Sequence, residues 1–304
     1  MAQPASPPAD SPRTFVKAER PEHPAFFLGG RIIYGHKELV SIQDGQTVWT
    51  LDSDKILREC WTKPPTLEVD NVRFLKKHTT VPVPEILESW TQGDRCFSIS
   101  DRVPGTLLSK VWSYLSIDEK DNIAKQTADA LAQLRALHSP RIESLGERPL
   151  YETSLFRGAH DEPRGPLNSD DELQHEMWKS LKSVPEDDRQ RLQARMPPSA
   201  PYTFTHGDLS MENILVHDGN LTAILGWERA AFLPVWWEFT AAEFSHGLEG
   251  KAWKTLLQKY MQSFEVERDW WVDFMLLSNS PTVDPPPKER GLFEDHDRET
   301  PTAP

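Results

Sequence analysis

A polar loop held between apolar flanks is the feature that most constrains the fold of this chain. The β-branched and aromatic residues at 203–205 are typical of a strand, and the apolar runs 214–216 and 221–225 predict two more. The Asp-Gly turn signal at 217–220 joins those two runs into a hairpin. Loops between rigid elements often carry functional residues, so residues 206–213 are the candidate functional loop.

The loop reads His206-Gly207-Asp208-Leu209, and Asn213 follows the aspartate after four intervening residues. This pattern resembles the catalytic loop of the aminoglycoside phosphotransferase and choline kinase group, relatives of the protein kinases with their H-R-D-x-x-x-x-N loop. The later Trp227-Glu228 and the aromatic residues 234–239 are similar to the fungal branch of that family. The alternative interpretation is a tight polar turn between two strands.

The resemblance implies a role for each residue of the loop. Asp208 orients the attacked hydroxyl and accepts its proton, and Asn213 offers an oxygen to a magnesium ion that bridges the phosphates of ATP. His206 is the second candidate catalytic residue, as an orienting group whose ring fixes the loop rather than as a base. Gly207 allows a backbone conformation that a side chain would obstruct.

The sequence departs from the family at Gly226, which stands where the family has the aspartate that holds the catalytic magnesium. Glycine offers no ligand, and one charge-stabilising contact is typically worth about 3 to 4 kcal/mol, so we expect impaired phosphoryl transfer. Glu228 is the alternative metal ligand, but it shares a side with position 226 only if the strand continues.

The resemblance also assigns a nucleotide-binding part. Extended runs and turns over residues 31–58 predict a small antiparallel sheet. The family's phosphate-binding lysine ends the third strand, where this chain has Arg58, with Lys55 as a competing candidate on the opposite strand face. A helix over 66–75 is similar to the family's next helix and implies that Glu68 pairs with the cation at 58. The alternative is a solvated surface glutamate.

The segment Phe97 to Gly105 resembles the strand and hinge that join the two lobes in the family. If ATP binds, the backbone at Ser100, Asp101 and Arg102 is expected to hold its adenine. Because backbone groups do this work, the side chains there say little about affinity.

The second half of the chain reads as mainly helical. Capping boxes are predicted at 116–119 and 169–172, each opening a helix, and the loop 139–168 borders the acceptor site in relatives. A helix over 235–246 is expected to end at Gly247, with Glu238 bracing the catalytic loop as in the family. Six of the eleven tryptophans lie at or after residue 227, which predicts a large buried aromatic core.

Composition excludes several classes of partner. The net charge of −13 argues against nucleic acid, whose binding needs a clustered basic face. No apolar run is long enough for a membrane span and no secretory signal is visible, so we expect no membrane partner and a cytosolic location. Cys60 and Cys96 are too few for a disulfide framework, which also favours a reducing compartment.

Together these features predict an α+β, two-lobed, protein-kinase-like fold. We expect a disordered lead over 1–24, a small antiparallel β N-lobe over 25–105, a larger, mainly helical C-lobe over 106–277, and a disordered tail over 278–304. The expected function is ATP-dependent phosphorylation of a hydroxyl on a small-molecule acceptor. The alternatives are a kinase-like binding or regulatory module without phosphoryl transfer, or other acid–base chemistry in natural-product biosynthesis. The sequence does not indicate an oligomeric state.

Overall fold

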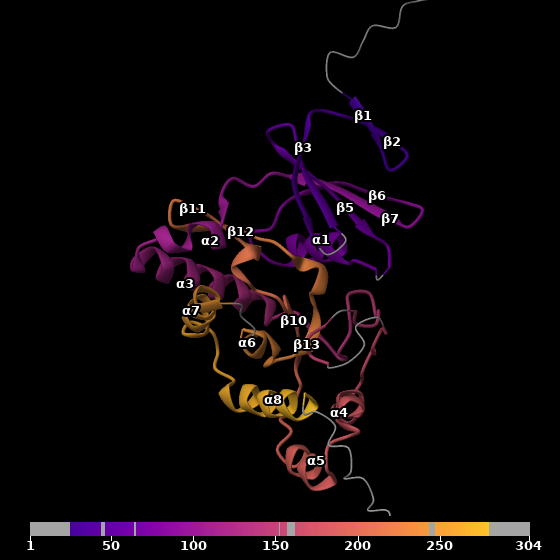
Figure 1. Cartoon of the computed structure of the whole chain (residues 1–304), viewed down its shortest axis with the longest axis vertical. Helices are drawn as coiled ribbons and strands as arrows, with labels where there is room; N and C mark the ends of the chain where they lie inside the picture. The colour runs from indigo at the N-terminus through magenta and orange to yellow at the C-terminus, as the bar shows by residue number, and fades with distance from the viewer. Residues whose placement is uncertain are drawn as a thin grey trace, which may run out of the picture.

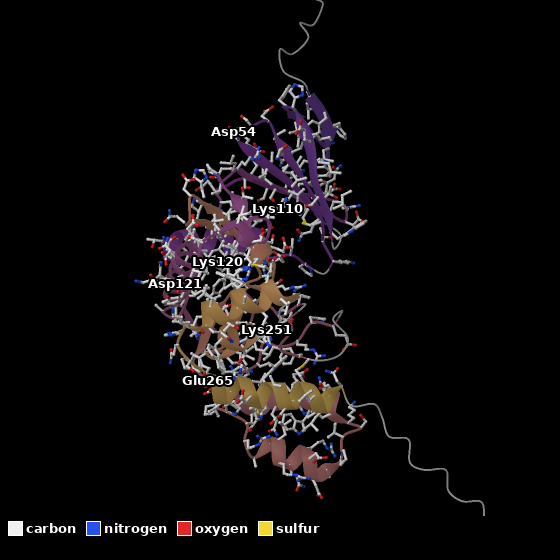
Figure 2. The ribbon with its side chains drawn as sticks, turned by 60° about the vertical axis from the view of Figure 1, so that its left-hand side comes forward. Asp54, Lys110, Lys120, Asp121, Lys251 and Glu265 are labelled. Atoms are coloured by element: carbon white, nitrogen blue, oxygen red, sulfur yellow. A yellow bond between two sulfur atoms is a disulfide. The ribbon has the colours of Figure 1, made fainter. Side chains whose placement is uncertain are left out.

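The computed structural model describes residues 25–43, 46–63, 65–151, 153–156, 162–242 and 247–279. An antiparallel sheet from the first third of the chain lies at one end, and a larger, mainly helical part forms the rest (Figure 1). In Figure 2, Asp54 lies at the sheet end, whereas Lys251 and Glu265 lie in the helical part. The predicted two-lobed α+β architecture is confirmed.

The N-terminal sheet has five antiparallel strands in the order β3-β4-β5-β7-β6, and a separate hairpin, β1-β2, precedes it. A small apolar core of Ile33, Leu51, Leu57 and Ile99 lies between the hairpin and the sheet, because alternate residues of each strand point to one face. The strand bounds are β1 Ala25–Leu28, β2 Arg31–Tyr34, β3 Lys37–Gln43, β4 Gln46–Leu51, β5 Lys55–Trp61, β6 Ile86–Gln92 and β7 Arg95–Asp101.

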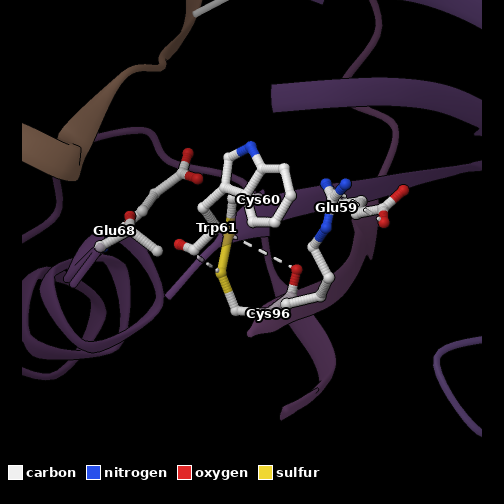
Figure 3. Close-up of a disulfide and its surroundings, with 7 residues drawn as sticks. Glu59, Cys60, Trp61, Glu68 and Cys96 are labelled. Carbon is white, nitrogen blue, oxygen red and sulfur yellow. Dashed lines mark hydrogen bonds and ion pairs between the residues drawn. A yellow bond between two sulfur atoms is a disulfide. The ribbon is translucent and has the colours of Figure 1, made fainter. Parts of the chain in front are cut away.

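Strands β5 and β7 are joined by a disulfide between Cys60 and Cys96, which lie directly opposite each other in the register (Figure 3). The two cysteines are 36 positions apart, and a disulfide that closes a loop of this length typically stabilises a fold by about 3 to 4 kcal/mol. The two cysteines therefore pair with each other, although they are too few to form a framework of several disulfides. Cysteine number says nothing about register, and here the register brings the two residues together.

Helix α1, Glu68–His78, follows β5 and packs between the sheet and the helical part. Its Asn71 is fully buried, and its amide nitrogen donates to the Trp227 and Ala230 carbonyls at 2.7 and 3.2 Å. Those carbonyls belong to the one-turn 3-10 helix η4, Trp227–Arg229, and to the residue that follows it. One side chain thus connects the helix beside the sheet to the segment after the catalytic hairpin.

The helical part carries two three-stranded sheets, β13-β10-β9 and β12-β11-β8. They hold the predicted strand, loop and hairpin, so that segment folds as the sequence predicted. The remaining bounds are β8 Thr106–Leu107, α2 Leu108–Val111, η1 Trp112–Tyr114, α3 Ile117–Leu134, β9 His138–Ser139, α4 Asp170–Trp178, η2 Lys179–Leu181, α5 Glu186–Gln193, β10 Tyr202–Thr205, η3 Met211–Asn213, β11 Ile214–His217, β12 Asn220–Ile224, β13 Ala231–Pro234, α6 Trp237–Ala241, α7 Gly247–Gln258 and α8 Glu265–Ser278.

The aromatic core of the second half is confirmed. All six tryptophans at or after residue 227 are at most 2% exposed, and four of them contact one another edge to face in the pairs 236/237, 236/270 and 237/271. These residues are Trp227, Trp236, Trp237, Trp253, Trp270 and Trp271. Such a core makes the helical part a rigid support for the loop above it.

The predicted helix starts are partly confirmed. Ser116 and Glu119 form a reciprocal capping box at α3. At α4 only half of the box forms, because the Glu172 carboxylate accepts from the Asn168 amide rather than from Ser169. Gly247 is the first residue of α7 rather than the end of the preceding helix, and α6 ends at Ala241.

The expected disordered lead and residues 280–304 of the expected tail lie outside the described residues, whereas Ser278 ends α8. Within the described ranges, no helix has the length and apolar character needed to cross a membrane.

Candidate active site

The candidate catalytic loop follows β10, and the carboxylate of Glu238 accepts hydrogen bonds from its backbone. Glu238 of α6 is buried and accepts hydrogen bonds from the His206 amide at 2.6 Å and the Gly207 amide at 3.4 Å. Gly207 has φ +81°, a conformation that favours glycine. The predicted brace at Glu238 and the backbone role of Gly207 are confirmed.

The His206 ring is fully buried, and both of its nitrogens are used within the loop. Nδ1 accepts from the Asp208 amide at 3.1 Å, and Nε2 lies 2.7 Å from the Leu225 carbonyl, which can only accept. The ring is therefore neutral with its proton on Nε2. Burial lowers the pKa of His206, in agreement with that state. A ring with both nitrogens engaged positions the loop and has no free site for a substrate proton.

Asp208 presents its carboxylate at the end of the loop, with 40% of the side chain exposed. Its Oδ2 accepts from Nη1 of Arg229 at 3.3 Å, and Arg229 is the last residue of η4. Lys254 of α7 is buried within electrostatic range of both Asp208 and Glu238, and burial lowers the pKa of Lys254. Sequence reasoning singled out neither cation, since neither belongs to the loop pattern.

Asn213 lies on the same loop, and its amide is turned toward Gly226. Its Nδ2 donates to the Asp208 backbone carbonyl at 2.7 Å. Gly226 has φ +75°, and a Cβ built there would lie 2.4 Å from Oδ1 of Asn213. The carboxamide of Asn213 therefore fills the space into which a side chain at 226 would project.

Arg58 and Glu68 form the predicted ion pair between β5 and α1. The side chains are 23% and 12% exposed, and the Glu68 carboxylate raises the pKa of Arg58. Lys55, the competing candidate, instead lies 3.3 Å from Asp54 at the start of its strand. Glu68 is therefore not a solvated surface residue, and it also lies in the surroundings of the disulfide (Figure 3).

Glu228 lies on the one-turn helix η4 and not on a continuation of strand β12. Strand β12 ends at Ile224 and η4 begins at Trp227, so the strand does not continue past Gly226. The charged neighbours of Glu228 are Glu68, Arg58 and Arg229. Burial, reinforced by Glu68, raises the pKa of Glu228 to about 6.

The hinge residues make hydrogen bonds within the protein. Ser100 is buried in β7 between partners on β5 and β6, while the amides of Asp101 and Arg102 donate to the carbonyls of Glu85 at 3.0 Å and Asp54 at 2.7 Å. The amide of Val103 makes no hydrogen bond to any described residue. The hinge amide without a protein acceptor is therefore that of Val103, one residue after the predicted Ser100, Asp101 and Arg102.

Comparison with known proteins agrees with this arrangement. The family model of the phosphotransferase enzyme family matches residues 44–271. This chain belongs to that family. Its fold is similar to that of the streptomycin–ATP–APH(2″)-IIa ternary complex, with 16% identity, 80% of this chain and 83% of that chain covered, and a TM-score of 0.55.

Two further solved structures have similar folds. The ADP-bound aminoglycoside phosphotransferase APH(2″)-Ib has 16% identity, 80% and 86% coverage and a TM-score of 0.54. A thermostable mutant of APH(4)-Ia, in a ternary complex with AMP-PNP and hygromycin B, has 15% identity, 80% and 84% coverage and a TM-score of 0.52. No curated protein matches the chain by sequence.

The magnesium ion implied by the family does not fit the residues of this chain. Position 226 has no side chain, so Oδ1 of Asn213 lacks the carboxylate that would share a metal ion with it, and the Asp208 carboxylate accepts from Arg229. Glu228 faces Arg58 and Glu68 instead of completing a ligand set. Among the described residues, no three His, Cys, Asp or Glu side chains gather in a way that could hold a metal ion.

Proposed function

We propose that this chain binds ATP where the sheet meets the helical part and transfers a phosphoryl group to a hydroxyl of a small molecule. Family membership supports this reaction class. The similar structures hold ATP, ADP or AMP-PNP, and two of them also hold an aminoglycoside. A hydroxyl-bearing acceptor and a cytosolic location are part of the proposal for this chain.

The placement of Asp208 is the observation that carries the proposal. Its carboxylate is partly exposed, while the backbone behind it is fixed by Glu238 and the neutral ring of His206. A carboxylate held in this way orients an acceptor hydroxyl and accepts its proton. His206 then acts as a positioning residue, which leaves no support for acid–base chemistry at His206 itself.

We assign the nucleotide contacts to two groups, the Arg58 guanidinium and the Val103 amide. Arg58, oriented by Glu68, is the cation from the sheet for the phosphates. The Val103 amide is the hinge donor for adenine, because the amides of Asp101 and Arg102 already donate to protein carbonyls. The backbone from Ser100 to Val103 therefore forms the proposed adenine edge.

Acceptor-dependent formation of ADP tests this proposal. The full chain is incubated with ATP and excess magnesium, and with choline, streptomycin, gentamicin or hygromycin B, and ADP is measured by chromatography. We expect at least one acceptor to raise ADP formation, and Asp208→Asn to reduce it by about a hundredfold or more. ADP formation that Asp208→Asn leaves unchanged contradicts the role of Asp208.

A binding module without transfer is the second candidate, and Gly226 is the observation that favours it. Loss of one charge-stabilising ligand removes about 3 to 4 kcal/mol from transition-state stabilisation. ATP binding together with no ADP formation above the Asp208→Asn background, for every acceptor, selects this candidate.

A further inference from the structure

The inference concerns the cation beside Asp208. Arg229 contacts that carboxylate through a single nitrogen at 3.3 Å, and 39% of the Arg229 side chain is exposed. No other hydrogen bond to its guanidinium is found among the described residues. A guanidinium has five N–H donors, so most of them remain available to a ligand.

A second guanidinium approaches from the sheet. Arg58 on β5 pairs with Glu68 of α1, and Asn71 of the same helix donates to the Trp227 carbonyl of η4, the turn that carries Arg229. Both arginines also lie within electrostatic range of the partly buried Glu228 carboxyl. The two arginines therefore converge on one region, although they come from different lobes. Each has one carboxylate partner, Glu68 for Arg58 and Asp208 for Arg229.

The space for a metal-binding side chain is closed in the same region. The Asn213 carboxamide occupies the volume beside Gly226, and its hydrogen bond to the Asp208 carbonyl holds it there. The chain therefore lacks a metal-binding side chain at Gly226 and has a cation, Arg229, at the end of the one-turn helix that follows. Guanidinium groups bind phosphate oxygens in bidentate pairs and stay charged throughout the physiological pH range.

We propose that Arg229, together with Arg58, neutralises the phosphates of the bound nucleotide, so that ATP binds to this chain without a divalent metal ion. This inference rests on the proposed binding of ATP between the lobes. It assigns to Arg229 a ligand contact that the loop pattern does not contain. Asp208 then competes with the phosphates for the same guanidinium.

Isothermal titration of the full chain with ATP, in EDTA and in excess magnesium chloride, tests the proposal. We expect the two dissociation constants to agree within about threefold, and Arg229→Gln to weaken ATP binding in EDTA by about tenfold or more. The control is Arg191→Gln on α5, which removes an exposed arginine with 74% of its side chain accessible and is expected to leave the affinity unchanged.

Asp208→Asn adds a readout that a purely structural role of Arg229 does not produce. Freeing Arg229 from its carboxylate is expected to tighten ATP binding in EDTA by about threefold. That gain is expected to disappear in the Asp208→Asn/Arg229→Gln double variant, which separates release of Arg229 from simple loss of negative charge. Should Arg229→Gln fail to fold, Arg229→Lys takes its place, because lysine keeps the charge but loses the planar fork.

Two outcomes overturn the inference and can be told apart. ATP binding that requires magnesium and ignores the Arg229 variants refutes the metal-free site but leaves the proposed function intact. Absence of ATP binding in both EDTA and magnesium removes the proposed function as well.

Discussion

Glu228 is a partly buried carboxyl within electrostatic range of the Glu68 carboxylate, and its pKa is raised to about 6. A raised pKa means that the folded state holds the proton more tightly than the unfolded state, whose value is near 4.5. Stability linked to this group is therefore present below about pH 4.5 and is lost as the pH rises to about 6. At neutral pH the charged form costs on the order of 2 kcal/mol.

Glu228→Gln removes this titration at nearly constant size. We expect the variant to gain on the order of 2 kcal/mol over the parent chain between pH 4.5 and pH 7.5, as measured by urea unfolding at both values. The exposed Glu249→Gln is the control, and its difference from the parent is expected to change little over that range. A Glu228→Gln variant that loses stability relative to the parent on going to pH 7.5 refutes this sign.

At the residue scale, the sequence did not predict that Arg229 contacts Asp208. The loop pattern predicted Asp208 and Asn213, and the missing ligand at Gly226 was visible in the sequence. The sequence does not specify that the Asn213 carboxamide occupies the space beside Gly226 while its Nδ2 donates to the Asp208 carbonyl. Arg229 has no pattern of its own, and its contact with Asp208 arises from the one-turn helix η4.

At the scale of elements, the contact between α1 and η4 depends on one buried amide. Asn71 donates to two backbone carbonyls and has no exposed surface, and its own Oδ1 lacks a partner among the described residues. In the sequence, Asn71 reads as an ordinary polar position of a helix. Its burial follows from packing against a segment more than 150 residues away, so no local signal reveals it.

Asn71→Ala leaves the carbonyls of Trp227 and Ala230 without their donor. We expect a loss of about 1 to 3 kcal/mol in the free energy of unfolding, measured by urea titration, because unsatisfied buried acceptors carry that cost. Asn279→Ala, at an exposed helix end, is the matched control and is expected to change stability by less than about 0.5 kcal/mol. Equal effects of the two variants would falsify the connecting role of Asn71.

The disulfide between β5 and β7 was missed for a different reason. Counting cysteines tests for a framework of several bonds, whereas one cross-strand bond requires only that two strands pair in register. Strand existence was predictable from apolar alternation, as the confirmed strands over 31–58 show. Which strands become neighbours depends on the whole sheet, and β6 and β7 come from beyond the following helix.

For the whole molecule, the fold was predictable from the sequence. The loop at 206–213 was expected between a strand and a hairpin, and the structure places it between β10 and the β11-β12 hairpin. The helical part provides the aromatic core that holds the loop, and the sheet provides Arg58 with its partner Glu68. The active-site proposal depends on how these two parts meet. That meeting point carries two arginines and three carboxylates, those of Glu68, Asp208 and Glu228.

A crystal structure of the chain grown with ATP and magnesium tests this account most directly. We predict phosphate oxygens within hydrogen-bond distance of Arg229 and Arg58, adenine against the Val103 amide, and the Asn213 carboxamide still filling the space beside Gly226. A structure in which Asn213 and Asp208 coordinate a magnesium ion, with Arg229 turned away from the phosphates, would contradict it.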